Sequence, residues 1–251
     1  MTTSNKVPNV DVFFWIIKIL ATTVGETAAD FLSQRLHLGL VVTSFVMSAI
    51  FLIALFFQMK SDRYIRSLYW TVVVFISVVG TLISDDLVDN LGVSLTTTTV
   101  AFGSALAVVF LIWWTSERTL SVHTIVTTKR EAFYWATILS TFALGTSAGD
   151  LFSEKLQLGY PLSAAMFAAA IAGIAIAHYL FKIDGIFSFW IAYILTRPLG
   201  ASIGDLLSHP VKDGGLGLGT TLTSLAFLTT IVALVAYLTF RGTSQRWALD
   251  N

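Results

Sequence analysis

Eight apolar stretches follow one another along the chain and limit what it can fold into. They lie at about residues 11–33, 40–59, 67–88, 93–115, 132–153, 161–181, 186–208 and 216–240. A helix needs about 20 mostly apolar residues to cross the hydrocarbon core of a bilayer. Only 12% of the residues are charged, about half the share of a soluble domain, so the chain cannot form a charged shell. The sequence therefore predicts an all-α integral membrane protein with eight transmembrane helices.

Composition also excludes several classes of function. The formal net charge is zero and there is no cysteine, so we expect no nucleic-acid partner, no disulfide and no thiol chemistry. The histidines are few and scattered, and no nucleophile lies near a base in the sequence. We therefore expect no cofactor and no enzymatic activity.

The basic residues between the stretches predict the orientation, because cytoplasmic connections carry an excess of Lys and Arg. One side has Arg35, Lys155 and Lys212. The other has Lys6, Lys60, Arg63, Arg66, Arg118, Lys129, Arg130, Lys182, Arg241 and Arg246. Both termini are therefore expected in the cytoplasm. The first stretch has no small-residue cleavage site, so it is interpreted as a span and not as a cleaved signal peptide.

A motif of the form Trp-x9-Gly-x4-Asp occurs four times, once in every second apolar stretch. Its members are Trp15, Gly25 and Asp30; Trp70, Gly80 and Asp85; Trp135, Gly145 and Asp150; and Trp190, Gly200 and Asp205. Each repeat contains two spans, so all four enter the membrane in the same direction. The chain divides into residues 1–115, with repeats one and two, a cytoplasmic linker at 116–131, and residues 132–251, with repeats three and four. Together they are expected to form one membrane domain.

The charges predict how the spans are layered. Acidic and basic residues inside the membrane occur only in the odd-numbered spans, and charged groups turn away from lipid. The odd helices should therefore be inner and the even helices outer. The four repeat glycines each lie four residues before another small residue, a spacing that lets helices approach closely. The four repeat tryptophans are expected to anchor the helices at the membrane interface.

A second stripe beside the glycines carries the acids. It combines the four repeat Asp residues with Glu26, Thr81 and Thr146, whereas the fourth repeat has Ala201 at the equivalent position. A ring of carboxylates inside a membrane suits a cation, a metal ion or protons. Glu26, Asp30 and Asp150 are the candidate metal ligands. The alternative is that these acids only hold helices together or face outside water.

Two basic residues break the fourfold pattern. Lys18 lies close to Trp15 and is expected to snorkel to the cytoplasmic interface. Arg197 lies about 10 Å past Trp190 along the helix and needs an anionic partner, for which Glu26 is the expected one. Such a pair could be a structural clamp, a gate or an anion site.

At these residues the sequence resembles the bacterial "uncharacterised membrane-anchored protein" family, which has four tandem two-helix repeats of unknown function. The likeness covers essentially the whole chain, and it is carried by NKVP, FWIIKILATTVGETAADF, AFYWATI, ILTRPLGASIGD and KDGGLGL. The resemblance implies the architecture and a bacterial inner-membrane location, and it implies no activity.

We therefore expect a membrane transport protein for a cation, either a proton or a divalent metal. The alternatives are a non-transporting membrane protein, such as a sensor subunit or assembly factor, and, less favoured, an intramembrane enzyme. The partners expected are the lipid bilayer and the small cation or proton, and a homo-oligomer is compatible with the sequence.

Overall fold

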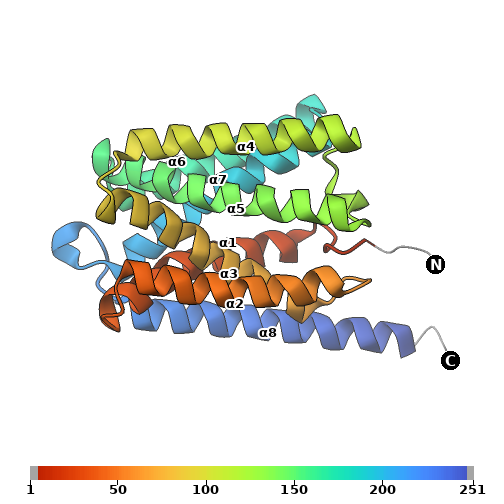
Figure 1. The fold of residues 1–251 in the computed structure, drawn as a ribbon, viewed down its shortest axis with the longest axis horizontal. Helices are drawn as coiled ribbons and strands as arrows, with labels where there is room; N and C mark the ends of the chain where they lie inside the picture. The colour runs from red at the N-terminus through yellow and green to blue at the C-terminus, as the bar shows by residue number, and fades with distance from the viewer. Residues whose placement is uncertain (1–4, 248–251) are drawn as a thin grey trace.

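The computed structural model describes residues 5–247, and over this range the chain forms eight long helices and no strand. The helices are α1 Val12–Asp30, α2 Leu40–Lys60, α3 Arg66–Asp85, α4 Leu95–Glu117, α5 Thr128–Asp150, α6 Gly159–Phe181, α7 Gly185–Ser208 and α8 Thr220–Trp247. Three π-helical turns extend α1, α3 and α5, namely η1 Phe31–Arg35, η2 Asp86–Asn90 and η4 Leu151–Lys155. Two short 3₁₀ helices, η3 Val122–Thr124 and η5 Val211–Asp213, lie in connections. The helices run roughly along one common direction (Figure 1).

Seven of these helices are long and apolar enough to cross a membrane. The long helix outside this group is α5, whose second half is rich in Ser, Thr and Gly and therefore less apolar. The protein is thus a helical, multi-pass membrane protein by length and composition. The linker predicted at 116–131 is shorter in the structure, since α4 ends at Glu117 and α5 begins at Thr128.

The odd-numbered helices form a closed inner ring. Helix α1 packs against α3 and α7, and α5 packs against the same two helices. In the most apolar stretch of α1, α3 and α7, 56–61% of the residues are buried inside the protein. In the even-numbered helices at most 22% of the equivalent stretch is buried. The layering therefore follows the charge pattern of the sequence, because the helices with ionisable residues surround the centre.

The outer helices pack on the ring in a regular order. Helices α2, α4 and α6 pack against α3, α5 and α7, the odd helices that follow them, and α8 packs against α1. The last helix of the chain thus completes the arrangement by covering the first.

The repeat glycines mark the close contacts within the ring. A Cβ atom added to Gly25 would overlap Ser77 on α3, and one added to Gly80 would overlap Phe142 on α5. Likewise, Gly145 lies against Arg197 on α7, and Gly200 lies against Thr22 on α1. Each glycine therefore lets its helix approach the next inner helix, as the small-residue spacing predicts.

All four inner helices begin at the same end of the bundle, where α8 also ends (Figure 1). We call this the tryptophan end and the opposite end the acidic end, after the repeat residues that lie there. At the tryptophan end the chain before α1 is held in place by Lys6. Its Nζ lies 2.7 Å from Glu131 Oε2 on α5 and donates to the Met59 carbonyl at 3.0 Å.

Candidate functional site

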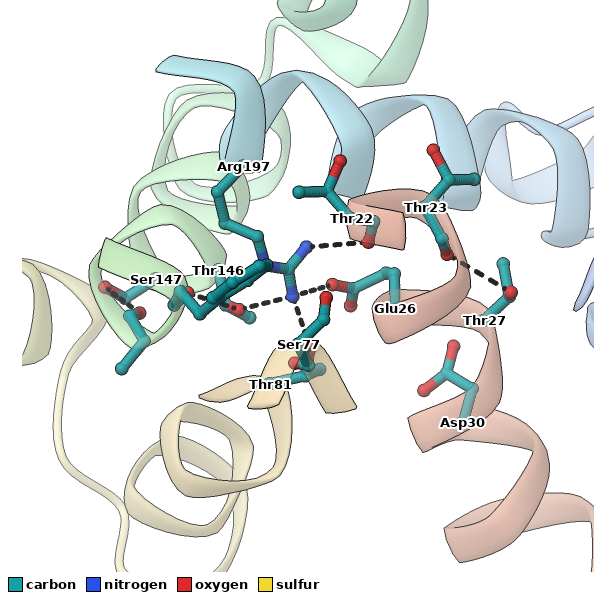
Figure 2. Close-up of polar contacts among 12 residues, drawn as sticks. Thr22, Thr23, Glu26, Thr27, Asp30, Ser77, Thr81, Thr146, Ser147 and Arg197 are labelled. Carbon is teal, nitrogen blue, oxygen red and sulfur yellow. Dashed lines mark hydrogen bonds and ion pairs between the residues drawn. The ribbon is translucent and has the colours of Figure 1, made fainter. Parts of the chain in front are cut away.

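Arg197 lies at the centre of the inner ring and contacts the three other inner helices. The guanidinium is fully buried, and its Nη2 lies 2.8 Å from Glu26 Oε2 on α1. The same Nη2 donates to Thr146 Oγ1 on α5 at 2.7 Å and to Thr81 Oγ1 on α3, while Nη1 donates to the Thr22 carbonyl at 3.4 Å. Figure 2 shows these side chains converging on the guanidinium from separate helices. We call this group the arginine layer, and it contains the expected Arg197–Glu26 pair.

The arginine layer is tightly but incompletely hydrogen-bonded. Nη2 carries two N–H groups and faces three oxygen atoms, so at least one bond is shared. The Nε of Arg197 has no hydrogen-bond partner among the described side chains and backbone groups. The layer also explains why the fourth repeat has Ala201 where the others have Glu26, Thr81 and Thr146. Helix α7 supplies the arginine, so its own position in this stripe needs no polar group.

The four repeat aspartates meet in one cavity at the acidic end, as their shared stripe predicts. The cavity has a volume of about 140 Å³, and we call it the acidic vestibule. Its lining includes Glu26, Asp30, Asp85, Asp89, Asp150, Glu154, Asp205 and His209. Glu26 belongs to both the vestibule and the arginine layer, so it connects the two.

One side of the vestibule brings together Asp30, Asp205 and His209, each with a ligand atom within 4.8 Å of the others. His209 Nε2 lies 3.8 Å from Asp30 Oδ2, and its Nδ1 shares a hydrogen bond of 2.6 Å with the Tyr160 hydroxyl. The Asp30 carboxylate raises the pKa of His209 above its usual value. Of the three predicted metal ligands, only Asp30 belongs to this group. Glu26 is held by Arg197 instead, and Asp150 lines another part of the cavity.

Lys18 does not snorkel to the interface, which corrects the expectation from the sequence. Its side chain is 1% exposed, and Nζ has no hydrogen-bond partner among the residues that the structure describes. The ammonium position lies 4.2 Å from the ring centres of both Phe142 and Tyr193. Arg197 lies over the same Phe142 ring, with Cζ 5.8 Å from its centre. Lys18 and Arg197 are therefore both buried inside the ring, and of these two Arg197 alone has a carboxylate partner within the described part of the chain.

The repeat tryptophans are also placed differently from the prediction. Trp70, Trp135 and Trp190 are 3–4% exposed, and only Trp15 is half-buried. They pack into an aromatic layer at the tryptophan end, where the Tyr69 and Tyr134 hydroxyls are 2.5 Å apart. The preceding aromatic of each repeat turns the indole inwards through edge contacts, as between Tyr69 and Trp70. These residues thus fix the helices to one another and do not form a lipid-facing anchor.

Three ionisable residues of the vestibule lining lie outside the repeat motif and were not predicted as site residues. Asp89 and Glu154 lie in the π-helical turns that follow Asp85 and Asp150. A π turn closes hydrogen bonds over five residues and shifts the direction of the side chains after it, and the sequence carries no clear signal for this. His209 could have been found, because it follows Asp205 by four residues and so shares its helix face.

Comparison with known proteins supports the repeat architecture. The family model described as "Repeat of Unknown Function (DUF347)" matches residues 13–64, 68–119, 133–184 and 188–244. Each match contains one inner and one outer helix. No curated protein and no solved structure matches the chain. Because the four matches cover most of the sequence, the chain belongs to the DUF347 repeat family.

Proposed function

We propose that the protein transports a cation across a membrane, and that the cation is the proton. In this proposal all eight long helices span the membrane as four parallel repeats, with both termini in the cytoplasm and the acidic vestibule facing outside. The vestibule would collect protons, since its lining includes seven carboxylates and one imidazole.

Lys18 is the observation that carries the proposal. Among the described residues the buried amine has no hydrogen-bond partner and contacts only the faces of two aromatic rings, and burying its charge costs several kcal/mol. A proton relay needs a group of this kind, which can hold and release a proton inside the membrane. Glu26 connects the vestibule to the arginine layer, and Phe142 connects Arg197 to Lys18. Titratable groups thus lie in the vestibule and, beyond Arg197, at Lys18, and water between Glu26 and Lys18 would have to complete the relay, since neither the arginine nor the phenyl ring releases a proton.

The same geometry favours a proton over a metal cation. A metal ion that crossed the inner ring would have to pass Arg197, which is always protonated, and then Lys18. Repulsion between unit charges at contact distance is worth several kcal/mol even at an effective dielectric constant of 20. A proton moves between titratable groups and requires no open pore, so Arg197 can block other cations without blocking proton transfer.

Proton flux into proteoliposomes tests the proposal. The untagged protein is reconstituted with a pH-sensitive dye inside, a potassium gradient with valinomycin sets the membrane potential, and internal acidification is followed. We expect acidification faster than in protein-free vesicles, and a loss of at least tenfold in Asp150→Asn and Lys18→Met. The same vesicles with metal-sensitive dyes test Zn²⁺, Mn²⁺ and Mg²⁺.

Two neighbouring aspartates provide a matched control. Asp85 lines the vestibule, whereas Asp86 accepts a hydrogen bond from Ser44 on α2 and lies outside the vestibule lining. Asp85→Asn should reduce proton flux and Asp86→Asn should leave it near the parent value. Parent-like flux in both Lys18→Met and Asp150→Asn would reject the relay, and metal flux without proton flux would replace the proton with a metal.

A second candidate is a non-transporting membrane protein, such as a sensor subunit or assembly factor. The arginine layer favours it, because the buried ion pair and three neighbouring oxygens fill the centre of the ring. In that case the acids are structural, and reconstituted protein should move no tested cation under any pH gradient.

A further inference from the structure

The last turn of α7 presents an imidazole and a carboxylate on one face. Asp205 and His209 are four residues apart, which aligns side chains along a helix. The His209 backbone N–H donates to the Asp205 carbonyl at 2.9 Å, so the helical spacing is kept at the end of α7. Pro210 follows and favours the extended backbone that His209 adopts. Asp30, at the end of α1, faces this pair because α1 packs against α7.

We propose that Asp30, Asp205 and His209 bind a divalent first-row transition-metal cation, represented by Zn²⁺, at the mouth of the acidic vestibule. Two carboxylates and one imidazole suit Zn²⁺ and its neighbours better than Ca²⁺, which takes six or more oxygen ligands. A three-residue set also leaves a fourth position for water, as in open zinc sites.

Asp205 distinguishes the proposed metal site from a simple cluster of acidic residues. The residue is 5% exposed, and within residues 5–241, whose side chains the structure describes, no group donates a hydrogen bond to its carboxylate or forms an ion pair with it. It lines the vestibule beside Asp30 and His209. A buried carboxylate without a partner is costly, and a divalent cation at this position would supply the missing partner. The carbonyl end of α7, which follows Asp205 closely, adds negative potential at the same place.

His209 is held as metal-ligating histidines are held. Its Nδ1 is engaged by the Tyr160 hydroxyl on α6, which leaves Nε2 facing Asp30. Ligating imidazoles almost always have their second nitrogen fixed in this way. In tetrahedral zinc sites the ligand atoms are roughly 3.3 Å apart, since the bonds are about 2.0–2.1 Å long. The three ligand atoms, now within 4.8 Å of one another, would therefore need to move by only about 1 Å.

A bound metal would regulate the vestibule. It would neutralise Asp30 and Asp205 and join the ends of α1 and α7, and so obstruct the entry of protons. This regulatory role rests on the proposed transport function, whereas the existence of the site does not.

Calorimetric titration of Zn²⁺ into the untagged protein in detergent, after chelator treatment, tests the site. We expect about one Zn²⁺ per chain and much weaker binding of Mg²⁺ and Ca²⁺. His209→Gln and Asp205→Asn should each weaken Zn²⁺ binding by at least tenfold. Tyr160→Phe should weaken it by about 10- to 100-fold, because it removes only the group that orients the imidazole. If the Asp205→Asn protein aggregates in detergent, Zn²⁺ binding by His209→Gln and Tyr160→Phe still tests the site.

Glu154 and Asp89 provide matched controls, since they line the same vestibule outside the proposed ligand set. Glu154→Gln and Asp89→Asn remove the same charge and should bind Zn²⁺ nearly as the parent does. If they weaken binding as much as Asp205→Asn does, the acids act only as a diffuse negative field and the site is rejected. Parent-like binding in His209→Gln would also reject it.

Proton flux with and without Zn²⁺ separates this inference from the proposed function. We expect Zn²⁺ to slow flux in the parent and to have no effect in His209→Gln. Zinc binding in a protein without proton flux would retain the site and overturn transport. Proton flux in a protein that binds no Zn²⁺ would overturn the site alone.

Discussion

Lys18 and Arg197 are buried in the same ring, but their environments predict opposite responses to substitution. Lys18 has no anionic partner in the described part of the chain, and its aliphatic stem and two ring contacts can be reproduced by Met. Replacing a buried charged group with a well-packed apolar one is often stabilising by about 1–4 kcal/mol. Lys18→Met should therefore raise the thermal unfolding temperature in detergent while it abolishes proton flux. A less stable Lys18→Met variant would mean that the amine has an important structural role.

The pair between Arg197 and Glu26 should behave as a coupled unit. Either Arg197→Leu or Glu26→Gln removes one partner and leaves the other in the ring, a change that costs about 3–5 kcal/mol. The double variant leaves no buried charge without its partner. Its loss of stability should therefore be smaller than the sum of the losses in the two single variants. Unfolding of all four proteins in one denaturant series checks this, and additive losses would show that the two charges are independent.

At the residue scale, the ion pair was predictable and the position of Lys18 was not. An arginine deep in a span requires an anion, and Glu26 was the acid at a comparable depth in the sequence. Whether the Lys18 ammonium can reach water depends on the side chains that pack around it. Phe142 and Tyr193 come from α5 and α7, which are far away in the sequence, and they close that route.

At the scale of helices, the stability of the inner ring depends on close approach at the repeat glycines. A Cβ added to Gly145 would overlap the side chain of Arg197, whereas one added to Gly173 on outer helix α6 would meet no atom within 4 Å. Gly145→Ala should destabilise the protein by about 1–3 kcal/mol through overpacking.

Gly173→Ala is the matched control, since it should stabilise the protein by up to about 1 kcal/mol through higher helix propensity. Thermal unfolding in one detergent compares the two variants. Equal effects at both positions would show that the glycine contacts of the ring are unimportant.

The start and type of each long helix were predictable from apolar length and repeat spacing, whereas their acidic ends were not. After Asp30, Asp85 and Asp150 the helices continue as π turns, and α7 instead remains α-helical to Ser208. Differences of this kind decide which later side chains turn back into the vestibule. They depend on packing against neighbouring helices, which a periodic sequence pattern does not specify.

For the whole molecule, four inner helices that begin at the same end of the bundle (Figure 1) can surround a common axis, and α1, α3, α5 and α7 pack in such a ring. The sequence also predicts a fourfold ring of carboxylates. In the structure the surroundings of these acids are not fourfold, because the repeats differ at two positions. Arg197 draws Glu26, Thr81 and Thr146 to the centre, while His209 joins only the acids from α1 and α7. The chemistry of the centre thus depends on the few positions where the repeats differ.

The sequence contains no cysteine, so a thiol reagent can react only with a cysteine that is introduced on purpose. Single introduced cysteines therefore test the membrane topology directly. Arg118 and Lys182 are exposed at the tryptophan end, and Leu156 and Lys212 are exposed at the acidic end. In intact cells, a membrane-impermeant maleimide should label Leu156→Cys and Lys212→Cys. It should label Arg118→Cys and Lys182→Cys only after the membrane is permeabilised, because the excess of Lys and Arg predicts that this end lies in the cytoplasm. The pair Arg118→Cys and Leu156→Cys tests α5, the least apolar of the inner helices. Labelling of both from outside would show that α5 does not cross, and a fully reversed pattern would place the acidic vestibule in the cytoplasm.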